Sequence, residues 1–173
     1  MQAADALLFA IAQISVSLAG FSGLIAALRA TTGEWHPRDI WSLSWMLGSS
    51  VGALLLALLP PWLALAGGAT DEHVYRVSCA GSAVAIGSFA IAMSLAGRRL
   101  TRRGFPRRVP AVPTTLFVLL GGAGLIDALG AAGAWGDRLA FAYVGSLMVL
   151  LVAAVLALCV FLILLARTAR SIE

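Results

Sequence analysis

The chain has 173 residues, of which 61% are hydrophobic and only 12% are charged, and its mean hydropathy is +0.96. Soluble domains carry about 25% charged residues, roughly twice this share, so the composition excludes an ordinary water-soluble domain. The formal net charge is +4, and every basic residue is an arginine. We therefore expect a single domain over residues 1–173, with lipid around most of its surface.

Five apolar runs are each long enough to cross a bilayer, which takes about 20 residues as a helix. Charged and turn-forming stretches separate them, such as TTGEWHPRD after the first run and GGATDEH after the second. Backbone polar groups must be bonded internally in hydrocarbon, so the runs predict an all-α, polytopic transmembrane bundle. The predicted spans cover residues 6–28, 41–66, 77–96, 112–132 and 139–166.

The first run is interpreted as a span and not as a cleavable signal, because Asp5 stands where a signal would be basic. A helix surrounded by lipid would be rich in Leu and Ile all round, whereas this one has polar residues on two faces. We expect it near the centre of an assembly, its hydroxyls either bonding back to the helix backbone or facing a water-lined path. The pore-lining candidates are Gln13, Ser15, Ser17, Ser22 and Arg29.

The second run ends near Pro60 and Pro61, which should kink or terminate its helix. Cys79 and Cys159 lie inside the third and fifth runs, without CxxC or Cys/His spacing. We interpret both cysteines as small buried apolar residues and expect no metal site.

The stretch GRRLTRRGFPRRVP between the third and fourth runs holds six of the twelve basic residues. In a five-pass arrangement ten arginines fall on one side of the membrane, and only Arg76 and Arg138 fall on the other. The positive-inside rule then places the N-terminus outside and the C-terminus in the cytoplasm. We expect the arginine loop to anchor this topology and to contact anionic lipid headgroups, not nucleic acid. Its arginines are Arg98, Arg99, Arg102, Arg103, Arg107 and Arg108.

The fourth run is the weakest helix, because five glycines lower its propensity, and a re-entrant element is the alternative. Asp127 lies inside it among small residues, which predicts a flush face packed against protein. An intramembrane acid indicates function, and a proton or cation role stays open beside structural pairing with Arg76 or Arg138. The predicted outer side would concentrate cations, because it gathers Asp5, Asp71, Glu72 and Asp137.

The stretch ISVSLAGFSGLIAALR, followed by GEWHPRD, resembles the opening helix of small uncharacterised bacterial multi-span membrane proteins. This resemblance implies a multi-pass protein of the bacterial inner membrane. The portion LAGFSGLIAAL is also similar to the pore helix of Orai-type calcium channels. That likeness covers about a tenth of the chain, and Leu28 stands where the family has its acidic selectivity ring. Calcium selectivity is therefore not carried over.

The function that the sequence favours is a homo-oligomeric ion-conducting pore lined by the first helix. A non-conducting scaffold or accessory subunit is the alternative, and a small solute or ion transporter is the third. Expected partners are the lipid bilayer, further copies of the chain and inorganic ions. There is no HExxH, phosphate-loop or Ser/His/Asp signature, so we expect neither an enzyme nor a cofactor.

Overall fold

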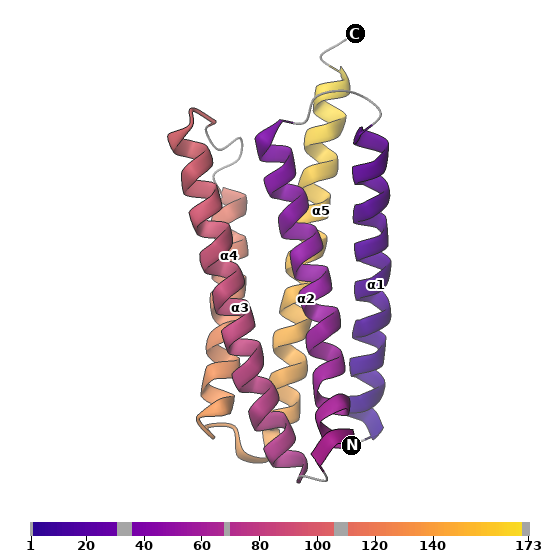
Figure 1. Cartoon of the computed structure of the whole chain (residues 1–173), viewed down its shortest axis with the longest axis vertical. Helices are drawn as coiled ribbons and strands as arrows, with labels where there is room; N and C mark the ends of the chain where they lie inside the picture. Colours follow the sequence, from indigo (N-terminus) through magenta and orange to yellow (C-terminus); the bar gives the residue numbers. More distant parts are fainter. Residues whose placement is uncertain (1, 31–35, 68–69, 106–110, 171–173) are drawn as a thin grey trace.

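The computed structural model describes residues 2–30, 36–67, 70–105 and 111–170. All five of its long helices are apolar enough to cross a membrane, which confirms the five predicted spans. The fourth is one continuous helix and not a re-entrant element. The elements are α1 (Gln2–Ala30), α2 (Pro37–Gly67), α3 (Asp71–Arg102), α4 (Ala111–Ala131), the 3-10 turn η1 (Gly136–Arg138) and α5 (Leu139–Arg170) (Figure 1).

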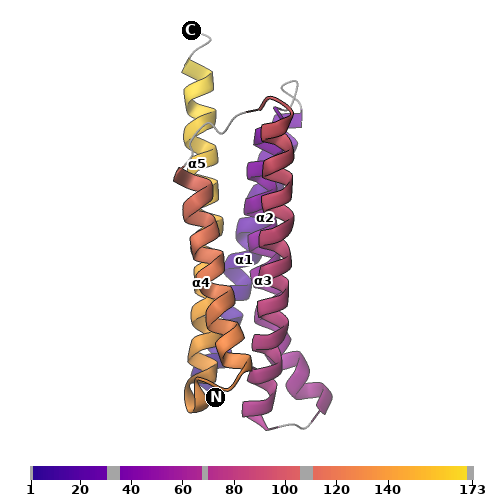
Figure 2. The same ribbon diagram turned by 90° about the vertical axis from the view of Figure 1, so that its left-hand side faces the viewer.

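Four of the helices form a closed ring. Helix α2 contacts α3, α3 contacts α4, α4 contacts α5, and α5 returns to α2. Helix α1 lies outside this ring, where it packs against α2 and α5 (Figures 1 and 2). One face of α1 is thus covered by its own chain, and the opposite face is left open.

The outer surface of the bundle is apolar, unlike that of a soluble protein. Large apolar side chains cover the outside, among them Phe141 and Val84, which are 82% and 73% exposed. Polar side chains are also present in the largely apolar interior, including Ser49, Ser82 and Asp127. Such a surface is stable in hydrocarbon and not in water. The chain therefore has the features of a multi-pass membrane protein.

The two ends of the bundle differ in charge. One, here called the acidic end, carries Asp5, Asp71, Glu72 and Asp137. The other, the arginine end, carries Arg38, Arg98, Arg99, Arg102 and Arg103. Arg107 and Arg108 lie outside the described residues. Every described arginine of the predicted loop thus lies at one end.

At the arginine end, α3 finishes in a Schellman motif, which requires a left-handed residue. Gly104 supplies it with φ +85°, and the N–H of Phe105 donates to the Leu100 carbonyl (3.1 Å). The carbonyl of Phe105 then accepts two hydrogen bonds from the Arg38 guanidinium (3.0 and 2.6 Å), which also donates to Thr101 (2.8 Å). The start of α2 is thereby tied to the end of α3.

The half of the bundle next to the arginine end is sealed by aromatic rings. Trp45 is completely buried at the centre of this aromatic cluster, with edge-on contacts at ring-centroid distances of 5.1 to 5.9 Å. The half next to the acidic end is more polar. Small residues let α3 and α4 approach closely there: a Cβ on Gly130 would lie 2.9 Å from the Cys79 sulfur. The aromatic cluster consists of Trp41, Trp45, Phe89 and Phe117.

Candidate functional site

Asp127 is the acid enclosed by the bundle, with an exposed fraction of 0%. It lies on α4 among small residues, as the sequence predicted, and faces α3. The Ser82 hydroxyl donates a 2.5 Å hydrogen bond to its Oδ2. Within the described part of the chain, Oδ1 has no hydrogen-bond partner. Burying a carboxyl group is costly unless its oxygens are hydrogen-bonded, and the described contacts compensate Oδ2 but not Oδ1.

The expected pairing of Asp127 with an arginine is not what the structure contains. Arg76 donates a 2.6 Å ion-pair hydrogen bond to Glu72, one turn earlier on its own helix. Arg138 is exposed in η1. Two side chains beside the carboxyl come from α5 instead, Ser146 and Tyr143. The acid is therefore held in a neutral polar setting and not in a salt bridge.

Ser146 lies beside Asp127, and its hydroxyl donates to the Tyr143 carbonyl at 2.8 Å. A hydroxyl has one proton and rotates to suit its partners. Rotation of the Ser146 side chain would redirect that proton towards the carboxyl. Asp127 consequently has a second hydroxyl within reach, in addition to Ser82.

Tyr143 is fully buried and connects α5 to α2. Its hydroxyl donates to the Leu56 carbonyl at 2.6 Å. In a regular helix that carbonyl would accept from the N–H four residues later, but position 60 is a proline and has no N–H. Tyr143 therefore satisfies the carbonyl that Pro60 leaves open. Helix α2 continues through both prolines to Gly67, so of the two effects expected of Pro60 and Pro61, a kink or a termination, the termination is wrong.

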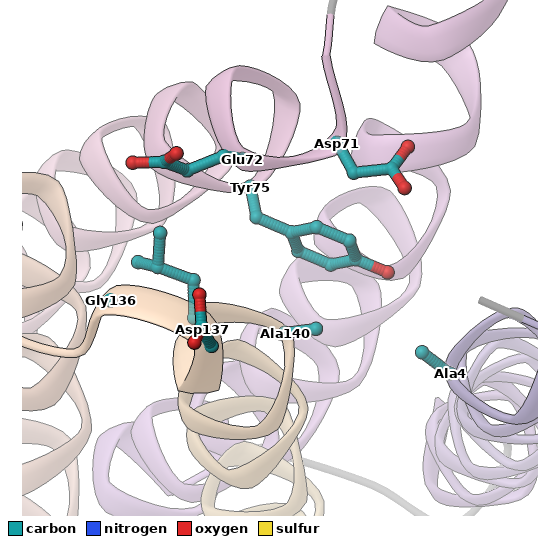
Figure 3. A pocket seen from close by; sticks show the side chains of 8 residues that line it. Ala4, Asp71, Glu72, Tyr75, Gly136, Asp137 and Ala140 are labelled. Atoms are coloured by element: carbon teal, nitrogen blue, oxygen red, sulfur yellow. The ribbon is translucent and has the colours of Figure 1, made fainter.

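A pocket of about 260 Å³ opens at the acidic end, between the starts of α1, α3 and α5. Figure 3 shows Tyr75 between Asp71 and Glu72, which point to opposite sides of its ring. The Tyr75 ring packs edge-on against that of Tyr143, with 6.1 Å between their centroids. The remaining pocket residues are Ala4, Gly136, Asp137, Leu139 and Ala140.

These contacts place the pocket, the two tyrosines and the buried acid in one succession. Tyr75 lines the pocket, Tyr143 packs against Tyr75, and Asp127 is close enough to Tyr143 to interact with it electrostatically. On the other side of Asp127, towards the arginine end, the aromatic cluster fills the interior. The surroundings of the buried carboxyl are therefore more polar on the side of the acidic end than on the side of the arginine end.

The pore-lining candidates of α1 fall on opposite faces of the helix. Ser15 and Ser22 are buried inside the subunit, whereas Gln13 and Ser17 are exposed on the outer face. Ser17 and Ser22 donate to carbonyls four residues earlier (3.1 and 2.7 Å), as the back-bonding interpretation expected. The side chain of Arg29 lies outside the described residues. The candidates therefore do not line one path within a single chain.

Three side chains around Asp127 were not singled out from the sequence: Ser82, Tyr143 and Ser146. A signal for them is present, because polar residues recur at helical spacing in otherwise apolar runs. Ser78 and Ser82 are four apart on α3, and Tyr143 and Ser146 are three apart on α5. Such pairs share a helix face. The sequence does not show how α3 and α5 are rotated about their own axes, and this rotation turns the two faces towards α4.

Comparison with known proteins gives no match: no protein-family model, curated protein or solved structure resembles the chain significantly. The resemblances of the first helix therefore stay predictions. Any functional assignment depends on the site itself.

Proposed function

We propose that this chain is an ion-translocating protein of the bacterial inner membrane in which Asp127 takes up a proton from the acidic end. The observation that carries the proposal is a completely buried carboxyl with one oxygen left without a partner among the described residues. Ionisable groups enclosed in a membrane bundle commonly mark ion or proton pathways.

The polar setting of Asp127 favours a proton over a metal cation. A bare alkali ion needs several oxygens to replace its hydration shell, whereas a proton needs one acceptor. The nearest hydroxyl, that of Ser82, points its proton at the carboxyl and therefore does not offer a lone pair to a cation bound there. Among the described residues, no three His, Cys, Asp or Glu side chains converge as a metal site.

The charge of the two ends supports an orientation with the acidic end outside. The described loop arginines lie together at the opposite end, and the positive-inside rule assigns such an end to the cytoplasm. Carboxylates around the outer pocket would raise the local proton concentration at its mouth. Protons would then pass Tyr75 and Tyr143, and the aromatic cluster would block direct leakage to the cytoplasm.

The route is closed in this conformation. The ring centroids of Tyr75 and Tyr143 are 6.1 Å apart, and the Tyr143 hydroxyl is engaged with Leu56. Proton transfer over such a separation requires a bridging water or movement of the rings. Passage beyond Asp127 requires the aromatic cluster to move as well. These two barriers favour a gated carrier over an open proton wire.

The direct test is proton uptake by vesicles containing the purified chain. A pH-sensitive dye in the lumen reports acidification after the external pH is lowered, with valinomycin and potassium holding the membrane potential at zero. We expect faster acidification than in protein-free vesicles of the same lipids. Equal rates would contradict the proposal and favour a non-conducting scaffold.

A homo-oligomeric pore lined by α1 is the second candidate, and the exposed face of α1 favours it. Gln13 and Ser17 are exposed near the middle of a membrane-spanning helix, where a polar amide is costly against lipid. Contact with a second copy would remove both from hydrocarbon. In that arrangement Gln13 and Ser17 would face the pore, while Ser15 and Ser22 would stay inside each subunit.

Oxidative cross-linking tests this second candidate. Cys159 is exposed, so the expectation that both cysteines are buried is wrong for this one. Gln13→Cys in a Cys159→Ser background therefore leaves only the buried Cys79 as another thiol. We expect a disulfide-linked dimer after copper-phenanthroline treatment of membranes. Val84→Cys in the same background is the matched control, because Val84 is exposed on α3, on the far side of the ring. Equal cross-linking of both variants, or a monomeric particle in detergent, would exclude the α1 pore.

A further inference from the structure

A second pocket opens at the arginine end, on the surface between α2 and α3. It encloses about 390 Å³. Two of its residues are the arginines Arg99 and Arg103, and most of the others are apolar. A positively charged rim over an apolar wall is the arrangement expected for a ligand with a charged head and an apolar body. The remaining lining residues are Pro37, Ile40, Trp41, Ser44, Ala96 and Leu100.

The inner wall of this pocket is held in place by Trp41. Its indole N–H donates to the Met93 carbonyl of α3 at 3.1 Å. The ring lies against Gly97, where an added Cβ would come within 3.3 Å of it. The bulky ring therefore separates α2 from α3 at this end, and the hydrogen bond keeps it fixed.

Two guanidinium groups, those of Arg99 and Arg103, lie at one end of the pocket. Arg99 lies in the last turn of α3, and Arg103 is the residue that caps the end of this helix. Both side chains are exposed, and both line the pocket. Arg38 lies 5.7 Å from the centre of the Trp41 ring and is fixed by its bonds to Phe105. None of the described residues that line the pocket is acidic. The first turn of α2 adds the positive end of a helix dipole.

The apolar wall continues from the pocket along α2. Ile40, Leu47 and Val51 are 50%, 41% and 37% exposed, and their spacing of seven and four places them on one face. This strip runs from the arginine end towards the middle of the span. An acyl chain would pack along this strip, whereas a free phosphate ion would not contact it.

We propose that this pocket binds an anionic phospholipid, with its phosphate between Arg99 and Arg103 and an acyl chain along the Ile40–Leu47–Val51 strip. Guanidinium groups bind phosphate through paired N–H donors, which suits the two arginines. The bound lipid would bridge α2 and α3 across the gap that Trp41 maintains. This proposal does not depend on proton transport and stands if the vesicle experiment fails.

Native mass spectrometry of the full chain in detergent tests the proposal, with phosphatidylglycerol and phosphatidylcholine added at equal concentrations. We expect the wild type to retain phosphatidylglycerol preferentially. Arg99→Gln/Arg103→Gln is expected to weaken that retention about thirtyfold, from roughly fivefold for each basic residue near an anionic lipid. The matched control is Arg98→Gln/Arg102→Gln, which removes the same charge from the same helical turns outside the pocket.

Three results would overturn the proposal. The first is equal weakening by both pairs of substitutions, which would mean general attraction to an arginine-rich surface. The second is equal retention of the two lipids by the wild type. The third is displacement of phosphatidylglycerol by inorganic phosphate at the same concentration, which would identify a simple anion site. Unchanged circular dichroism of both variants confirms that the fold is not the cause.

Discussion

Asp127→Asn is expected to reduce proton uptake by vesicles to the rate of protein-free vesicles. The amide has nearly the same shape and still offers an oxygen to Ser82, so the packing between α3 and α4 is preserved. It cannot bind and release a proton as a carboxyl does. The measurement is dye acidification under the same pH step and clamped potential as for the wild type.

Asp137→Asn is the matched control for this prediction. Asp137 also lies at the acidic end and lines the outer pocket, but it is exposed to solvent. Its loss removes one of the carboxylates at the pocket without touching the buried carboxyl, so uptake should fall far less than in Asp127→Asn. Wild-type flux in Asp127→Asn would contradict the proposed role of Asp127 in proton uptake, and unchanged thermal stability in the same variant would make the acid incidental to the fold as well.

Tyr143→Phe is expected to lower the free energy of unfolding by about 1 to 2 kcal/mol, because it leaves the buried Leu56 carbonyl without a donor. The ring and its packing are kept, so the loss reports the hydroxyl. The measurement is the unfolding midpoint in mixed micelles with increasing dodecyl sulfate, followed by tryptophan fluorescence.

In a chain that carries Tyr143→Phe, adding Pro60→Ala should restore most of the lost free energy of unfolding. The reason is that alanine restores the backbone N–H that reaches the Leu56 carbonyl within the helix. In a double-mutant cycle the two substitutions should therefore be coupled by an amount close to the single loss. Tyr75→Phe is the control, since its hydroxyl lines the open pocket and not the core. Additive effects of Tyr143→Phe and Pro60→Ala would mean that the hydroxyl does not replace the missing helix bond.

The five helices were predictable because hydrocarbon tolerates few alternatives for the backbone. The ends of the helices were harder to predict, as α3 shows. The predicted span covers residues 77–96, whereas the helix runs from Asp71 to Arg102. Hydropathy marks the part of a helix that lies in lipid. The charged turns at both ends, with Glu72 and Arg76 at one and Arg99 at the other, are helical outside that region.

The candidate site was predictable in part, again for a physical reason. The small neighbours of Asp127 correctly predicted a buried face, because a flush helix surface packs closely against protein. Its partners Ser82 and Tyr143 come from α3 and α5, and their identity depends on how each helix is rotated about its axis. Arg76 illustrates the same limit: a carboxylate four residues away on its own helix was a closer partner than Asp127.

The order in which the helices meet has a consequence for biosynthesis. The ring closes only when α5 contacts α2, and α1 also rests partly on α5. Of the five helices, α5 is therefore the one that is synthesised last and completes the interior. Until then Asp127 and Ser82 lack one wall of their enclosure, so the insertion machinery must shelter a partly open, polar-lined intermediate.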